Sequence, residues 1–107
     1  MKVKVTEDKL YPIFKKFMEI YFKNYEWRKD RLGNNWFIDP DGHGHMVLFN
    51  TSLLRIYHDI RENILRYIPM EESMLMSLMG KWVGETFKFK RIEAIEWSRQ
   101  GGIQYES

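Results

Sequence analysis

The spacing of apolar residues changes along this chain from a helical period to a strand period and back, and this change constrains the fold most. In residues 6–23 apolar side chains recur three and four positions apart, which predicts an amphipathic helix capped by Thr6 or Asp8. Pro12 then lies in the first turns, where its missing N–H matters least. The side chains predicted to face the core are Leu10, Ile13, Phe14, Phe17 and Tyr21.

Residues 25–49 follow the period of strands instead. Apolar and polar side chains alternate in residues 25–31, and shorter runs of strand-forming residues follow at 36–39 and 45–49. Turn-forming residues separate the runs, with Leu32-Gly-Asn-Asn35 in the first gap and Pro40-Asp-Gly42 in the second. The pattern predicts a three-stranded antiparallel meander.

The second half of the chain returns to helical spacing. A second helix is expected to begin at a cap within residues 50–52 and to end at Pro69, with Leu53, Ile56, Tyr57, Ile60, Ile64 and Ile68 facing the core. A third helix is expected to open at the acidic pair Glu71-Glu72, whose charges suit the positive end of the helix dipole, and to end at Gly84. Its apolar stripe is Leu75, Leu78, Met79 and Trp82.

The C-terminal region allows two interpretations. Residues 85–90 alternate like a strand, and the strand is expected to continue to about Trp97. Residues 91–100 are also good helix formers that Gly101-Gly102 could cap, so a short terminal helix is the alternative.

Together these segments predict an α+β fold. The meander and strands near both termini form a mainly antiparallel sheet, and two to three helices pack on one face of it. A chain of 107 residues, with 44% hydrophobic and 16% aromatic residues, can bury one modest core, so we expect a single compact domain over residues 1–107.

Composition also limits compartment and partners. The chain has no cysteine, residues 1–5 lack an apolar leader pattern, and the longest apolar runs are four residues, so we expect a cytoplasmic protein that does not contact a membrane. The net charge of +2 is smaller than a dedicated duplex-DNA binder usually carries, because such binders neutralise many phosphates.

Residues 39–45 hold the densest group of ligand-type side chains. Asp39, His43 and His45 could converge on a metal ion across a hairpin. Pro40-Asp-Gly42 between two strands is a turn signal, and no second cluster supports the metal site. We therefore rank the turn above the metal site and expect no metal and no cofactor.

Side-chain catalysis has little support in the sequence. His58 and Glu62 are one helical turn apart and could pair as acid and base. Arg55 and Asp59, and Glu62 and Arg66, share this spacing, which is typical of a solvated charge ladder. No nucleophile elbow, phosphate loop or zinc-protease run occurs, so we expect a protein that is not an enzyme.

One strand could bind single-stranded nucleic acid. Alternation places Tyr25, Trp27, Lys29 and Arg31 on one side, so bases could stack on the rings while phosphates meet the charges. The competing interpretation is that the two rings belong to the core, which is the more frequent place for aromatics in a small domain.

The third predicted helix could bind another protein. Met70, Met74 and Met76 add apolar area beside the stripe that contains Trp82, and methionine suits adaptable binding surfaces. The alternative is a wide buried face. We expect a protein-binding module whose partner is a host protein or a second copy, with nucleic-acid binding as the alternative.

The chain is a short, cysteine-free domain rich in methionine, lysine and aromatic residues, and it has no catalytic motif. In this build it resembles small phage or mobile-element accessory proteins. The resemblance is one of style and gives no residue a role. It implies a phage-type accessory or inhibitor protein that acts by contact with a host protein, or a structural part of a viral assembly.

Overall fold

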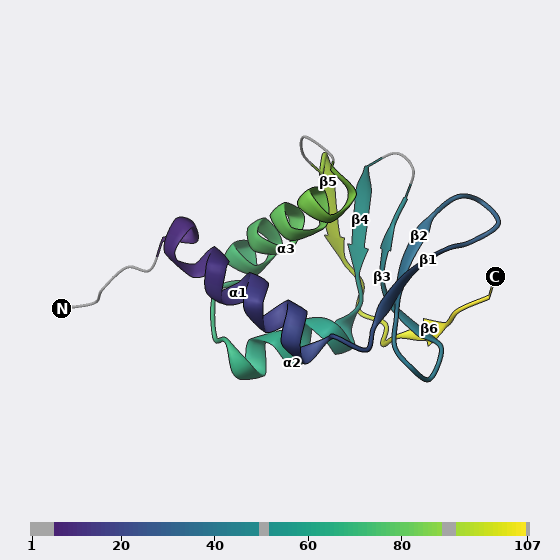
Figure 1. Cartoon of the computed structure of the whole chain (residues 1–107), viewed down its shortest axis with the longest axis horizontal. Coiled ribbons are helices and arrows are strands. Elements are labelled where there is room, and N and C mark those ends of the chain that lie inside the picture. Colours follow the sequence, from purple (N-terminus) through teal and green to yellow (C-terminus); the bar gives the residue numbers. More distant parts are fainter. Residues whose placement is uncertain (1–5, 50–51, 89–91, 107) are drawn as a thin grey trace.

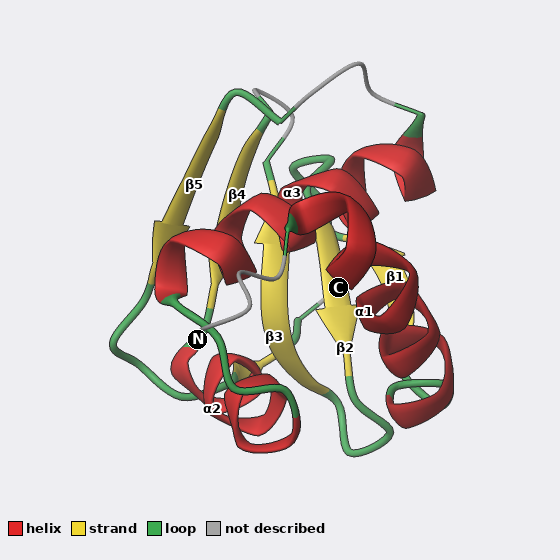
Figure 2. Ribbon diagram, turned by 90° about the vertical axis from the view of Figure 1, so that its left-hand side faces the viewer, coloured by secondary structure: helices red, strands yellow, loops and turns green. Residues whose placement is uncertain are grey.

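The computed structural model describes residues 6–49, 52–88 and 92–106, and it shows three helices that cover one face of a six-stranded sheet (Figures 1 and 2). The predicted α+β class is confirmed. In chain order the elements are α1 (Glu7–Tyr21), β1 (Glu26–Lys29), β2 (Asn35–Ile38), β3 (His43–Leu48), β4 (Leu53–Ile56), α2 (His58–Tyr67), α3 (Glu72–Phe87), β5 (Ala94–Trp97) and β6 (Ile103–Gln104).

The sheet is mixed but mostly antiparallel. Its strands lie in the order β1-β2-β3-β4-β5, and among the described strands only the β4–β5 pair is parallel. The chain passes from β4 to β5 through α2 and α3, the kind of long crossover that a parallel pair requires. The short strand β6 pairs with the first residues of β3, beyond the end of β4.

The two faces of the sheet differ because successive side chains of a strand point to opposite sides. One row of cross-strand neighbours faces the helices and joins the core: Trp27, Phe37, Met46, Ile56 and Trp97. The adjacent row faces away from the helices: Arg28, Trp36, Val47, Arg55 and Glu96. Arg55 Nε donates to Glu96 Oε1 at 2.5 Å on that outer face.

The meander forms close to the predicted positions. Gly33 and Gly42 occupy its two turns with φ values of 85° and 88°, a left-handed conformation that glycine adopts without steric cost. The turn chemistry read from the sequence is therefore confirmed.

The core face predicted for helix α1 is correct in part, because Phe14 is buried as predicted. Tyr11, Phe14 and Met18 are its buried residues, whereas Ile13 and Tyr21 are exposed. Leu10 and Phe17 are half-buried and pack against the core. Apolar side chains cover more than half of this helix, so spacing alone did not determine which of two adjacent stripes would face the sheet.

The predicted start of the second helix is wrong. Residues 53–56 form β4, which pairs with β3, and α2 begins only at His58. The buried residues Ile56, Ile60 and Ile64 were assigned to the core correctly, although Ile56 reaches it from a strand. Of the three cap candidates at residues 50–52, the structure describes only Ser52, which lies in the connection before β4.

Helix α3 continues past its predicted end. Gly84 lies inside the helix, which runs to Phe87, and the C-cap is Lys88 in the left-handed conformation with φ 61°. The prediction of a strand at residues 85–87 is therefore wrong, and residues 89–91 lie outside the described residues. Residues 94–97 form β5, as expected from the predicted continuation of the strand to about Trp97. The alternative of a terminal helix is therefore wrong there.

The strand predicted near the N-terminus, ahead of the first helix, also lies outside the described residues. Among the helices that are described, none has the length and apolar character needed to cross a membrane.

Candidate functional site

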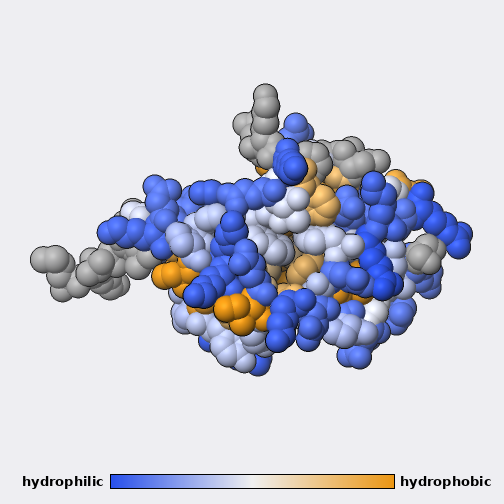
Figure 3. Space-filling model, viewed as in Figure 1, coloured by the Kyte–Doolittle hydropathy of each residue, from blue (hydrophilic) through white to orange (hydrophobic). Residues whose placement is uncertain are grey.

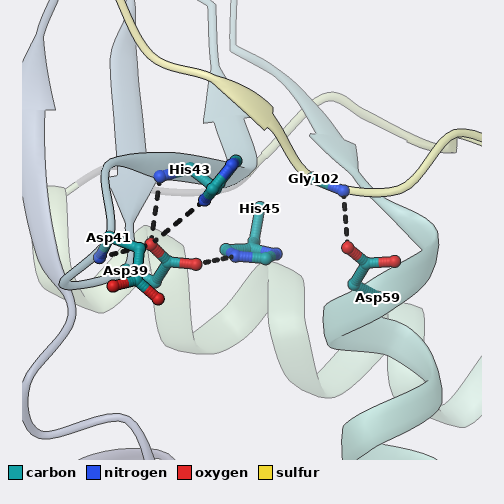
Figure 4. Close-up of polar contacts among 6 residues, drawn as sticks. All are labelled: Asp39, Asp41, His43, His45, Asp59 and Gly102. Carbon is teal, nitrogen blue, oxygen red and sulfur yellow. Dashed lines mark hydrogen bonds and ion pairs between the residues drawn. The ribbon is translucent and has the colours of Figure 1, made fainter.

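The cluster at residues 39–45 is organised as a turn between β2 and β3 (Figure 4). Asp39 Oδ1 accepts hydrogen bonds from the backbone N–H groups of Asp41 at 2.9 Å and His43 at 3.0 Å. The backbone N–H of Gly42 donates to the Asp39 carbonyl at 3.0 Å. These bonds are the ones that an aspartate makes when it closes a turn.

His45 lies at a β-bulge and is buried. Ile38 pairs with Gly44 and Phe37 pairs with Met46, so His45 has no opposite residue on β2. Its Nε2 lies 2.7 Å from Asp39 Oδ2, and its buried Nδ1 has no hydrogen-bond partner among the described residues.

Hydrogen bonding outweighs burial in setting the acidity of Asp39. Burial would raise the pKa of its carboxyl, but the hydrogen bonds from His45 and from the N–H of His43, together with the charge interaction with His45, hold the pKa below its usual value. Asp39 is therefore an ionised acceptor at neutral pH.

The C-terminal segment closes over this cluster. The N–H of Gly102 donates to Asp59 Oδ2 at 2.7 Å, and the N–H of His58 donates to the Gln100 carbonyl at 2.9 Å. A Cβ at Gly102 would lie 2.7 Å from Cε1 of His45, so the chain passes directly against the imidazole ring. The cluster thus joins the β2–β3 turn, the start of α2 and the C-terminal segment.

The three candidate metal ligands do not form a metal site. Asp39 and His45 bond to each other, while His43 Nδ1 lies 3.8 Å from Asp39 Oδ1 with its side chain about half exposed. Within the described ranges no group of three histidine or acidic side chains is placed to hold a metal ion.

The charge ladder predicted on the second helix forms only in part. His58 Nδ1 lies 3.9 Å from Glu62 Oε1, and Glu62 also pairs with Arg61 at 3.3 Å. Arg55 lies on β4 and bonds Glu96 rather than Asp59. The His58–Glu62 pair is a solvent-exposed ion pair of the kind that contributes little stability.

The aromatic half of the proposed nucleic-acid stripe packs on the helix side of the sheet. Tyr25 and Trp27 are half-buried against the core, with ring centroids 5.3 Å and 4.9 Å from that of Phe37. Lys29 and Arg31 are exposed. The arrangement gives the rings packing partners and leaves only part of their surface for a base.

The Met-rich segment, residues 70–82, is also partly used by the core. Met70, Met74 and Trp82 are half-buried and pack against the core cluster, and Met76 is half-buried. The Trp82 ring centroid lies 5.7 Å from that of Phe37 and 6.3 Å from that of Trp27. Part of each side chain stays in solvent.

A different apolar surface was missed by the sequence analysis. Ile13 is 60% exposed, Ile20 61%, Tyr21 43% and Tyr67, at the end of α2, 54%. Half-buried Phe17 lies between them, with ring centroids 5.1 Å from Tyr21 and 5.9 Å from Tyr67. We call these five residues the α1 surface.

The α1 surface includes a shallow groove along the helix, lined by Ile13, Lys16, Phe17, Ile20 and Tyr21. Figure 3 shows hydrophobic residues exposed in the region of α1, among hydrophilic side chains. The signal in the sequence was the excess of apolar residues in 10–21, more than one buried stripe requires.

Comparisons with family models, with curated proteins and with solved structures gave no match. The class that the chain defines by itself is an α+β domain with one helix-covered sheet face and an exposed apolar helix surface.

Proposed function

We propose that this protein is a non-enzymatic protein-binding module and that the α1 surface is its main contact. The observation that carries the proposal is the clustering of exposed large apolar side chains. Among the described residues the exposed large hydrophobics are Ile13, Ile20, Tyr21, Leu32 and Tyr67, and all except Leu32 belong to the α1 surface. Contiguous exposed apolar area of this kind marks interaction sites.

The α1 surface has enough large apolar side chains to support measurable binding of a partner. Complete burial of a large apolar side chain stabilises by roughly 1.5–3 kcal/mol, so covering two isoleucines and two tyrosines could support micromolar binding after ordering costs. Aromatic side chains are also favoured as anchors in interfaces because they bring large area with few rotatable bonds.

The surface is held in place before any partner arrives. Phe14 and Met18 fix the opposite side of α1 in the core, and Tyr11 bonds to Glu85 of α3. Tyr21 and Tyr67 have ring centroids 5.0 Å apart, which links α1 to α2. A rigid contact surface loses less entropy on binding than a mobile one.

The Met-rich segment is a second proposed contact. Its partial burial leaves less apolar area to a partner than the α1 surface offers, so we rank it behind. The phage-type accessory or inhibitor role expected from the build of the chain stays a prediction that fits a contact protein.

A variant comparison tests the proposal. The tagged full chain, its Ile13→Glu/Ile20→Glu variant and its Leu32→Glu variant are each crosslinked in the cells that make the protein, and the captured proteins are quantified by mass spectrometry. We expect a specific partner that the double variant loses by at least tenfold and that Leu32→Glu retains, because Leu32 is even more exposed than the two isoleucines but lies in the β1–β2 turn.

Thermal melting of all three proteins provides the control for folding, and we expect similar midpoints. A partner kept by Ile13→Glu/Ile20→Glu and lost by Met74→Glu/Met76→Glu would contradict the α1 assignment and favour the Met-rich segment. Absence of any partner that depends on either surface would contradict the binding function itself.

A further inference from the structure

We infer that the partner of the α1 surface is an amphipathic helix that carries carboxylates beside its apolar stripe. The inference rests on the proposed function and adds the chemistry of the partner. It follows from the charge beside the groove, from the shape of the groove and from the poor fit of a second copy.

The open side of the groove is basic. Lys9, Ile13, Lys16 and Ile20 are all exposed and follow one another at spacings of four, three and four residues, so they form one stripe on α1. Lys16 itself lines the groove. A partner docked on the two isoleucines would therefore bring its flanking side chains close to two ammonium groups.

The other end of the α1 surface is also close to a cation. The charge of Arg66 acts on the Tyr21 hydroxyl, where it opposes the rise in pKa that the hydrogen bond to Tyr67 and burial cause. Arg66 is exposed, at the last turn of α2. Arg66 directly precedes Tyr67 of the α1 surface in the chain, so a second source of positive charge lies at the α2 edge of that surface.

Glu19, the acidic residue in the same turn of α1 as Lys16 and Ile20, lies farther from the groove than Lys16 does. The charge of Glu19 acts on Tyr11, which belongs to the buried side of α1 next to α3. By helical geometry Glu19 projects roughly 100° around the axis from Ile20, and as the i+3 neighbour of Lys16 it lies on the side of that lysine away from Phe17 and the groove. The border of the groove is therefore basic, and carboxylates on a partner would complement it.

The groove has the length and pattern of a helix contact. The two exposed isoleucines are seven residues apart, about 10 Å along the axis at 1.5 Å per residue. Two turns of a partner helix, with anchors at i, i+3 or i+4, and i+7, span the same distance. Phe17 and Tyr21 also line the groove, and their ring centroids lie 5.9 Å and 5.0 Å from that of Tyr67.

A second copy of this chain fits the groove poorly. Two-fold contacts are isologous, so an antiparallel pairing of two α1 helices centred on the groove would bring Lys16 beside Lys16 of the second copy. Like charges at such a contact are unfavourable. A different chain that supplies carboxylates avoids this repulsion.

Two designed helical peptides test the inference against the full-length chain. Both carry leucines at i, i+4, i+7 and i+11; the acidic peptide has glutamates on both flanks, and the matched basic peptide has lysines there. Binding of each fluorescently labelled peptide is measured by anisotropy at low and high salt.

We expect the acidic peptide to bind at least tenfold tighter than the basic one, with the difference shrinking at high salt because exposed charges are screened. Lys16→Glu should weaken the acidic peptide several-fold and strengthen the basic one. Arg99→Glu, an equal charge reversal at an exposed position outside α1, should change neither. Ile13→Glu/Ile20→Glu should lose both peptides.

Several results would overturn the inference. Equal binding of both peptides, still lost in Ile13→Glu/Ile20→Glu, would reject the acidic partner while the proposed protein-binding function stands. Failure of both peptides to bind would reject a helical partner, and the crosslinking comparison above would still decide the proposed function.

The other two candidate occupants of the groove, a second copy of the chain and a lipid surface, are tested with the same variants. A dimer seen by analytical ultracentrifugation that Lys16→Glu or Ile13→Glu/Ile20→Glu disrupts would show that a second copy fills the groove. Binding of the chain to phosphatidylserine vesicles through the same residues, without preference for the acidic peptide, would show that the basic border meets a lipid surface. Either result overturns the inference.

Discussion

The hydroxyl of Tyr11 donates a hydrogen bond to Oε2 of Glu85 at 2.6 Å, across 74 positions of the chain, and joins α1 to α3. Burial and the neighbouring carboxylate raise the pKa of Tyr11, so the hydroxyl keeps its proton and acts as the donor. Lys15 also approaches Glu85, at 3.9 Å. This contact fixes how α1 sits on the core and therefore how it presents its exposed side.

We predict that Tyr11→Phe lowers the free energy of unfolding by about 1–2 kcal/mol, because a hydrogen bond to a charged acceptor is lost while the ring stays packed. Urea denaturation followed by circular dichroism would measure it. Lys15→Ala serves as the comparison and should cost less than about 1 kcal/mol, since its ion pair is exposed. Equal effects of the two changes would contradict the role given to the hydroxyl.

Asp39→Ala is expected to destabilise the protein by about 1–3 kcal/mol, because it leaves the buried His45 ring without its one described hydrogen-bond partner. The folded-state pKa of Asp39 is depressed, so its contribution is present above the unfolded value of about 3.9 and is lost as pH falls through the folded value.

The pH dependence gives a second measurement of the same contact. Between about pH 5 and pH 3 the wild-type chain should lose stability more steeply than Asp39→Ala, and urea melts at several pH values would show the difference. Asp41→Ala, in the same turn but exposed, is the matched control and should keep the wild-type slope. Parallel curves for wild type and Asp39→Ala would contradict the assignment.

A methyl group at Gly102 should be poorly tolerated. The new Cβ would lie 2.7 Å from Cε1 and 2.8 Å from Nδ1 of a His45 ring that Asp39 holds in place, so we expect a loss of about 1–3 kcal/mol. At Gly80 the new Cβ would lie 2.8 Å from Cδ1 of Ile95, the flexible end of a half-buried side chain.

Gly80→Ala also gains helix propensity of roughly 1 kcal/mol, so we expect it to be close to neutral. Differential scanning calorimetry of the two variants would rank them. If Gly102→Ala melted at or above the wild-type temperature, the C-terminal segment would not be held against His45 as described.

The Trp27→Ala variant distinguishes the two interpretations of the ring, as part of the core or as a platform for a nucleic-acid base. The ring packs on Phe37 and Phe87 at centroid distances of 4.9 Å each, so we expect a loss of about 2–4 kcal/mol in unfolding free energy. If single strands bind here, Lys29→Ala with Arg31→Ala should weaken binding and flatten its salt dependence. Titration with labelled oligonucleotides at low salt is the test, and no binding there would end the alternative.

The sequence by itself determined the local features of this protein. Helical spacing within α1, α2 and α3 and alternation in the meander follow from which residues are apolar, and the turns at Gly33 and Gly42 follow from a glycine that can adopt positive φ. Much of the core, such as Ile60, Leu75 and Leu78, could be predicted for the same reason. These choices depend on neighbours within a few residues.

Only the tertiary structure decided those features for which the local sequence allows two outcomes. Residues 53–56 satisfy both periods, and hydrogen bonding to β3 makes them a strand. Helix α1 has apolar residues on two adjacent stripes, and packing against α3 and the sheet buries Phe14 and exposes Ile13, which creates the proposed contact surface. The physical reason is that burial depends on partners distant in the chain, and the 3.6-residue period does not encode which stripe meets them.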